Sequence, residues 1–186
     1  MKTIWCSIIA IVATSLLATI ATAQVMPWDK QITDNKRFKV INQYGNAAVL
    51  DQETGIVWER SPTPTKTKWS PYGLTATAHI QCNVKVVGNR LGWRLPTIQE
   101  LASLLDPTQI RPPLPVGHPF VLSADQQIGQ FWSATTASTD TADTNAAWFV
   151  DFNVLDPNSF VLYGAGQKDT LRYYWCVRSG QGVDPQ

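Results

Sequence analysis

The chain of 186 residues lacks an excess of charge of either sign, internal repeats and low-complexity tracts. Its 15 basic and 14 acidic residues leave a formal net charge of +1 at pH 7. A dedicated nucleic-acid binder normally carries a strong basic excess. The near-neutral balance therefore argues against nucleic acid as a partner, and the length fits one domain with a sizeable core.

Cysteine and histidine are scarce, with three and two residues respectively. His79 precedes Cys82 by three positions, which is helical ligand spacing, but a zinc site needs about four ligands and no second pair is apparent. His118 lies in a proline-rich stretch and has no assigned catalytic partner. We therefore expect no metal, no other cofactor and no enzymatic activity.

An export signal is predicted at the N-terminus. Lys2 supplies a positive charge, residues 4–20 form an apolar stretch, and residues 21–23 match the small-x-small pattern of a signal-peptidase site. A membrane anchor is the alternative, but the apolar stretch is barely long enough and no basic stop-transfer residues follow it directly. We expect cleavage before Gln24, no membrane span afterwards, and a protein that is secreted, periplasmic or at the cell surface.

Two cysteines, Cys82 and Cys176, remain after cleavage because Cys6 lies in the signal. An even pair in an exported chain is first interpreted as a disulfide. The positions lie 94 residues apart, and closing such a loop is worth on the order of 4 kcal/mol in the chain-entropy description. A thiol catalyst is the alternative. The predicted bond would tie a helix to the last strand.

Three short strands and two helices are predicted in the first half. The strands are expected at residues 38–41, 47–50 and 56–58, with an acidic turn before the third that lacks the ligand spacing of a calcium-binding EF-hand loop. Apolar residues at helical spacing predict the first helix at about residues 72–87. The second helix begins at residue 97 with a capping box and ends before Pro107.

Two proline-rich loops and several late strands complete the pattern. The loops are expected at residues 61–71 and 107–119, and the second contains five prolines. Residues 164–166 read as a turn between strands. Early helices and late antiparallel strands indicate the α+β class. The late strands are expected at residues 131–134, 147–152, 159–163 and 173–178.

Four motifs follow one another along the chain. They are Leu50-Asp51-x-x-Thr54-Gly55-x-x-Trp58-Glu59, Gly92-Trp93-Arg94-Leu95-Pro96-Thr97-x-x-Glu100-Leu101, Trp132-Ser133-Ala134-Thr135 and Trp175-Cys176-Val177-Arg178. Together they resemble the bacterial Lcl C-terminal domain family, which is named for the terminal domain of a collagen-like surface adhesin. The resemblance spans about residues 38–182, between an N-terminal extension at residues 24–37 and a tail at residues 183–186.

This resemblance implies a C-type-lectin-like fold, with two helices packed on antiparallel sheets and long loops. It also implies an exported or surface role. The named adhesin of the family binds sulfated glycans, while many relatives have no known activity. The collagen-like stalk is absent here, since the sequence has no Gly-x-y repeat. From their physical chemistry, we expect the motif residues to maintain the fold. Their tryptophans should pack in the core, and Arg94 and Arg178 should pair with carboxylates such as Glu59 or Glu100.

Basic residues in the two proline-rich loops are the candidate binding residues. They could meet an anionic or sulfated glycan or a surface protein, and the alternative is a solvated charged loop. Residues 135–145, with Asp140 and Asp143, offer a weaker calcium-binding candidate. The candidate ligand-binding residues are Arg60, Lys66, Lys68, Arg111 and His118.

Two further functions are alternatives to binding. One is a structural or assembly component of a surface appendage, which a neutral, aromatic-rich domain also suits. The other is an oxidase of the formylglycine-generating type, whose domain is related to the implied fold. Such an oxidase requires reactive cysteines with a copper-binding pair. Cys82 and Cys176 instead have the sequence context of structural residues, so we expect a binding domain.

Overall fold

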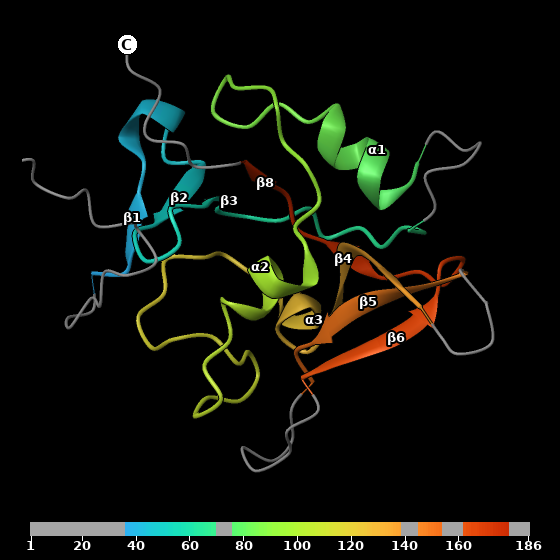
Figure 1. Ribbon diagram of the computed structural model, residues 1–186. Coiled ribbons are helices and arrows are strands. Elements are labelled where there is room, and N and C mark those ends of the chain that lie inside the picture. The colour runs from blue at the N-terminus through green and yellow to red at the C-terminus, as the bar shows by residue number, and fades with distance from the viewer. Residues whose placement is uncertain (1–35, 70–75, 139–144, 154–161, 179–186) are drawn as a thin grey trace, which may run out of the picture.

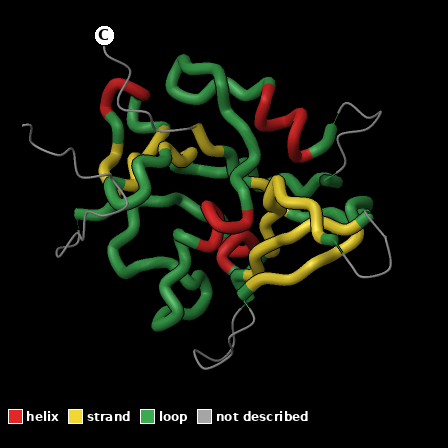
Figure 2. The backbone as a smooth tube through the Cα atoms, viewed as in Figure 1, coloured by secondary structure: helices red, strands yellow, loops and turns green. Residues whose placement is uncertain are grey.

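The computed structural model describes residues 36–69, 76–138, 145–153 and 162–178, which form a mixed α+β fold (Figure 1). The strands of these residues make two four-stranded sheets. The helices are short, and loops connect most of the elements (Figure 2). The predicted α+β class is confirmed. The predicted signal peptide, the C-terminal tail and the acidic pair at 140 and 143 lie outside the described residues.

The first sheet is antiparallel and contains the three predicted early strands. Its order is β1 (Phe38–Val40), β2 (Ala48–Asp51), β3 (Val57–Glu59) and β8 (Val177–Arg178). In the turn between β2 and β3, the amide of Gly55 donates to the carbonyl of Asp51 at 2.8 Å, and the φ of 72° favours glycine there. The acidic turn is thus a hairpin connection.

The carboxylate of Asp51 in that turn is buried and paired. Arg37 donates from Nε to Oδ1 at 3.0 Å and from Nη2 to Oδ2 at 2.7 Å. The same guanidinium donates to the carbonyl of Ser103 at 2.5 Å. A buried carboxylate is stable only when it is paired, so Asp51 needs this arginine. Arg37 in turn links the first sheet to the end of the second helix.

The second sheet is mixed. Its order is β6 (Tyr163–Gln167), β5 (Ala146–Asp151), β4 (Gln130–Ala137) and β7 (Tyr173–Tyr174). The pairs β4–β5 and β5–β6 are antiparallel, but β7 runs parallel to β4. Residues 168–172 carry the chain from one edge of this sheet to the other, and such a crossover delivers the next strand in the parallel direction. The expectation of antiparallel pairing throughout was wrong for this strand.

The predicted turn at residues 164–166 is instead part of β6. A Cβ atom on Gly166 would lie 2.4 Å from Nη2 of Arg172, and one on Gly164 would lie 3.0 Å from the ring of Phe149. Glycine at both positions therefore allows close side-chain packing on one face of the strand. Of the strand predicted just before them, only residues 162 and 163 are described, and β6 begins at Tyr163.

The last predicted strand, at residues 173–178, divides between the two sheets. β7 joins the second sheet and β8 joins the first. Trp175 and Cys176 lie between them with 0% exposure of either residue. The sequence pattern is continuous because residues 173–177 are all buried, so it carries no sign of the change of sheet.

The helices are shorter than expected. α1 (Ala78–Asn83) has Thr77 as its N-cap, and it ends before Val84 and Val86, which are 65% and 60% exposed. The predicted C-terminal part of this helix was therefore wrong. α2 (Ile98–Ala102) begins with the predicted capping box: Thr97 Oγ1 accepts from the amide of Glu100 at 3.2 Å, and Glu100 Oε2 accepts from the amide of Thr97 at 2.8 Å.

A third helix, α3 (Ala124–Gln127), was not predicted. It also starts with a capping box, because Ser123 and Gln126 exchange side-chain and backbone hydrogen bonds. The serine-x-x-glutamine pattern was the available signal. The helix has only four residues, which is too short for a visible apolar period. Residues 107–119 have neither helix nor strand, as predicted.

Two hydrophobic clusters lie on the two faces of β4 and β5. One contains Trp132 and Ala147, and the other contains Phe131 and Val150. Neighbouring residues of one strand enter different clusters because side chains alternate between the faces of a sheet. All four predicted core tryptophans are at most 1% exposed, which confirms their structural role. They are Trp58, Trp93, Trp132 and Trp175.

The predicted disulfide between Cys82 and Cys176 is present. Both residues are fully buried in the cluster that contains Trp132. The bond joins α1 to the segment between β7 and β8. It therefore connects a short helix to the place where the chain passes from one sheet to the other.

Ion pairs hold the motif residues, in part as predicted. Arg94 forms the expected bidentate pair with Glu100, at 2.7 Å from Nη1 to Oε2 and 2.6 Å from Nη2 to Oε1. Glu59 pairs with Lys85 instead of an arginine, at 2.6 Å between Nζ and Oε1. Burial raises the pKa of Glu59, and the neighbouring Lys85 opposes that shift.

No helix among the described residues has the length and apolar character needed to cross a membrane.

Candidate functional site

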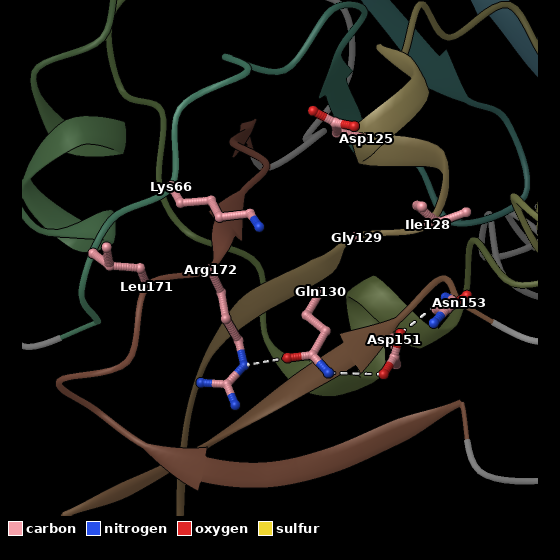
Figure 3. A pocket seen from close by; sticks show the side chains of 9 residues that line it. All are labelled: Lys66, Asp125, Ile128, Gly129, Gln130, Asp151, Asn153, Leu171 and Arg172. Atoms are coloured by element: carbon pink, nitrogen blue, oxygen red, sulfur yellow. Dashed lines mark hydrogen bonds between the residues drawn. The ribbon is translucent and has the colours of Figure 1, made fainter.

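A polar pocket of about 290 Å³ lies where β4 begins and β5 ends (Figure 3). Six of its lining residues carry the argument, and we call this set the polar pocket. They are Lys66, Asp125, Gln130, Asp151, Asn153 and Arg172. The pocket collects residues from a loop, a helix and two sheet strands, which lie far apart in the sequence.

The floor of the pocket is a hydrogen-bonded row across the sheet. Gln130 and Asp151 are direct partners in the β4–β5 pairing, so their side chains lie on the same face. Gln130 donates from Nε2 to Oδ2 of Asp151 at 2.8 Å, and the amide of Asn153 donates to Oδ1 at 2.9 Å (Figure 3). These bonds hold the carboxylate in one orientation.

Arg172 extends this row. Its Nε donates to Oε1 of Gln130 at 2.9 Å, and its Cζ lies 4.2 Å and 4.1 Å from the ring centroids of Trp132 and Phe149. The guanidinium is thus held against two aromatic faces, which attract a cation. The backbone is held too, because Arg172 and Thr67 exchange hydrogen bonds at 2.8 Å and 3.1 Å.

Burial changes the acid–base properties of Arg172. Residue exposure is 9%, and Nη1 has no hydrogen-bond partner among the described residues. This burial lowers the pKa of Arg172, and the charge of Asp151 opposes the shift. An arginine retains its proton at neutral pH. The polar pocket therefore rests on a fixed positive charge.

Lys66 and Asp125 face this floor from other elements. Lys66 is exposed, and its Nζ lies 5.0 Å from the ring centroid of Tyr173, with the side chain reaching toward the pocket (Figure 3). Asp125 is in the first turn of α3. Gly129 also lines the pocket, and its lack of a side chain lets the Tyr173 ring pack closely, since a Cβ there would lie 2.6 Å from that ring.

The structure brings two of the five predicted binding residues to this pocket. Lys66 lines it. Arg111 reaches its edge, because Nη2 donates to Oδ1 of Asn153 at 3.2 Å. The exposed side chain of Lys68 is not among the pocket's lining residues, although it is only two residues from Lys66.

Arg60 and His118 lie elsewhere. Arg60 is half-buried and joins two loops, with its Nε donating to the carbonyl of Pro119 at 3.0 Å and Nη1 to that of Asn46 at 3.3 Å. His118 stacks on Phe120, with ring centroids 5.8 Å apart. Burial lowers the pKa of His118, which favours the neutral imidazole at neutral pH. Neither residue offers a free cation to the polar pocket.

Sequence reasoning missed Gln130, Asp151 and Arg172. These residues belong to strands or adjoin them, and nothing in their local pattern separates them from ordinary surface positions. Only strand pairing places Gln130 opposite Asp151, and only the crossover after β6 brings Arg172 to them. Among the described residues, no group of three or more histidine, cysteine, aspartate or glutamate side chains could hold a metal ion.

Comparison with known proteins identifies the family. Residues 47–178 match the family described as the Lcl C-terminal domain. No curated protein and no solved structure matches the chain. The family suggests a surface-associated domain, and the disulfide is compatible with an extracellular location. The matched residues cover most of the chain and include all four motifs, so the chain belongs to the Lcl C-terminal domain family.

Proposed function

We propose that the chain is an exported, non-enzymatic binding domain with a C-type-lectin-like fold, and that the polar pocket binds an acidic glycan. One observation carries the proposal: fixed positive charge and orientated hydrogen-bonding groups converge on a single concave site. Three cations, Lys66, Arg111 and Arg172, stand in or beside the pocket, against the two carboxylates of Asp125 and Asp151.

The cations would serve the anionic group of such a glycan. Lys66 is exposed and provides up to three donors on a flexible stem, so it can follow a carboxylate or sulfate group. Arg172 contributes through its charge, because its guanidinium is already packed against Trp132 and Phe149. In the partly enclosed pocket these charges act more strongly than on an open surface.

The carboxylate of Asp151 would serve the sugar hydroxyls. Each of its oxygens accepts one hydrogen bond, from Gln130 or from the amide of Asn153. An ionised carboxylate has about four lone-pair sites, so acceptor capacity remains for hydroxyl donors. Because the row is already orientated by these bonds, ligand binding would need little ordering of side chains.

The state of the cysteines supports a binding role over an oxidase role. An oxidase of the formylglycine-generating type would need reactive thiols, whereas Cys82 and Cys176 are bonded to each other and fully buried. Titration of free thiols in the folded, exported protein should find none. Two reactive thiols would contradict the disulfide and remove this argument against the oxidase.

Binding to an array of sulfated, carboxylated and uncharged glycans is the primary test, followed by calorimetric titration of the best acidic ligand. We expect Lys66→Ala to raise the dissociation constant for that ligand about tenfold, which is the effect of losing one charge-assisted hydrogen bond. Lys68→Ala is the matched control, because this lysine is exposed but does not line the pocket. Binding should weaken as salt is added. Equal losses in both variants, or no acidic ligand on the array, would refute the proposal.

A further inference from the structure

We propose a second binding site, for the apolar face of an uncharged sugar ring, on the opposite face of the second sheet. The site is a pocket of about 420 Å³ between α2 and strands β4, β5 and β6, and we call it the aromatic pocket. Its volume lies within the range of small-ligand sites. Its lining residues are Ile98, Gln99, Ala102, Thr135, Trp148 and Tyr163.

Strand alternation places this pocket away from the polar one. On β5, Phe149 and Asp151 point to the face that carries Arg172, so Trp148 points to the other face. On β6, Tyr163 pairs with Val150 and Ala165 pairs with Trp148, and both pairs lie on that second face. A ligand in the aromatic pocket therefore cannot touch the polar pocket.

Two aromatic rings form one wall. Trp148 and Tyr163 pack edge to face, with centroids 6.1 Å apart and an angle of 67° between their planes. Tyr163 is 51% exposed and Trp148 is half-buried. The residue opposite Trp148 is the small Ala165, which leaves the indole uncovered by its cross-strand neighbour. Partly exposed aromatic rings beside a hollow are typical of ligand sites.

The opposite wall is a helix held firmly in place. The amide of Ile98 donates to Oγ1 of Thr135 at 3.0 Å, which ties the start of α2 to β4. The capping box and the bidentate pair between Arg94 and Glu100 fix the same helical turn. The width of the pocket is therefore set by hydrogen bonds of the protein itself.

The polar groups at the rim are uncharged. Thr135 uses its oxygen to accept from Ile98, so its hydroxyl proton remains available to a ligand. Gln99 is exposed at the first turn of α2, and Tyr163 contributes its phenol. Among the described residues that line the pocket, none is charged. An anion or cation would find no countercharge among these described lining residues.

An uncharged pyranose matches this arrangement. Its ring has an apolar face of C–H groups, which can lie against Trp148 or Tyr163, and hydroxyls around the edge for Thr135 and Gln99. A purely apolar ligand would make no use of these hydrogen-bonding groups at the rim, and a charged sugar would lose solvation without gaining an ion pair from the lining residues. The chemistry of the pocket therefore favours the uncharged sugar over both.

The test is titration of the whole exported domain with uncharged oligosaccharides built from glucose, galactose, mannose or N-acetylglucosamine. We expect one of them to bind, and Tyr163→Ala to weaken it about tenfold through loss of ring contact. Tyr163→Phe should retain binding, because the ring remains. Leu91→Ser is the matched control, since Leu91 is similarly exposed, at 64%, outside the pocket.

The proposals for the two sites can be tested independently of each other. Tyr163→Ala should leave acidic-glycan binding unchanged, and Lys66→Ala should leave uncharged-sugar binding unchanged. The aromatic site is refuted if no uncharged sugar binds, if Tyr163→Phe loses binding as fully as Tyr163→Ala, or if only an apolar fluorescent dye binds in a way that depends on Tyr163. If the native domain binds an uncharged sugar but no acidic glycan, only the proposal for the polar pocket is refuted.

Discussion

The two faces of the β4–β5–β6 sheet carry opposite chemistry. One face presents Arg172 on Trp132 and Phe149, beside the Gln130–Asp151 row. The other presents Trp148 and Tyr163 beneath α2. The strands are the same, and only the parity of the residue position differs. A single sheet can thus display two unlike surfaces at no cost to its hydrogen bonding.

The aromatic residues have different tasks on the two faces. Trp132 is fully buried and serves as a platform for a cation of the protein itself. Tyr163 is 51% exposed and has no such partner among the described cation–aromatic contacts. An aromatic ring already covered by arginine cannot accept a ligand, whereas an exposed one can. This difference is the reason for proposing two ligand classes.

Removal of the disulfide should lower the stability of the protein more than any other change, and it should weaken ligand binding unequally on the two faces of the second sheet. The double variant Cys82→Ser, Cys176→Ser loses a cross-link over 94 residues, which is worth about 4 kcal/mol of unfolding free energy. The bond lies in the cluster with Trp132, so acidic-glycan binding should decline more than uncharged-sugar binding. Urea unfolding and both titrations measure this. Equal losses of affinity for the acidic and the uncharged ligand would contradict the proposed difference between the two faces.

Replacement of Arg172 should have an intermediate effect, confined to one face. Arg172→Met substitutes a shorter, uncharged and flexible side chain, which removes the cation over two rings and the bond to Gln130, so stability should fall by about 2 kcal/mol. Acidic-glycan binding should be lost, because the fixed charge is gone. Uncharged-sugar binding should persist. Chemical unfolding and titration are the measurements, and loss of both ligands would show that the faces are coupled.

Acidification should have the smallest effect on stability, and it should act through Glu100 in α2, the helix that lines the aromatic pocket. Burial acts to raise the pKa of Glu100, but hydrogen bonds from Arg94 and from the amide of Thr97 lower it overall. A depressed pKa means that the stabilisation is complete above the ordinary value of about 4.3 and is lost as pH falls through the folded-state value. Because the Arg94 side chain is 36% exposed, solvent screening limits the effect to about 1 kcal/mol.

Urea unfolding of the native chain and of Glu100→Gln at several pH values would measure this contribution. At pH 7 the variant should be less stable by that amount, and the difference should shrink as the native glutamate becomes protonated. A constant difference over the whole pH range would show that the pair between Arg94 and Glu100 is not responsible.

Local patterns predicted the first sheet and the second helix well. The strands around Asp51 and Gly55 and the capping box of Thr97 depend on neighbours within a few residues, so the sequence records them directly. The pattern failed at residues 84–87, where Val86 continues the helical spacing but is exposed, as Val84 is, after the helix has ended. A period of apolar residues cannot report which of them will be covered.

The candidate site was predictable only in part. Lys66 and Arg111 could be chosen because they are basic residues in proline-rich loops. Gln130 and Asp151 could not, since they are 21 positions apart and meet only through strand pairing. The glycines of β6 were misread for the same reason, because the need for Gly166 comes from the guanidinium of Arg172 packed against it.

Sequence alone determined the α+β class, the family, the cysteine pair and the buried tryptophans, because each depends on residue type and local order. Tertiary structure decided which cations stand together, which face of the second sheet is polar, and which aromatic rings remain exposed. These outcomes depend on strand register and on a crossover between distant segments. Register is a property of pairing between strands, and no single segment of the chain contains it.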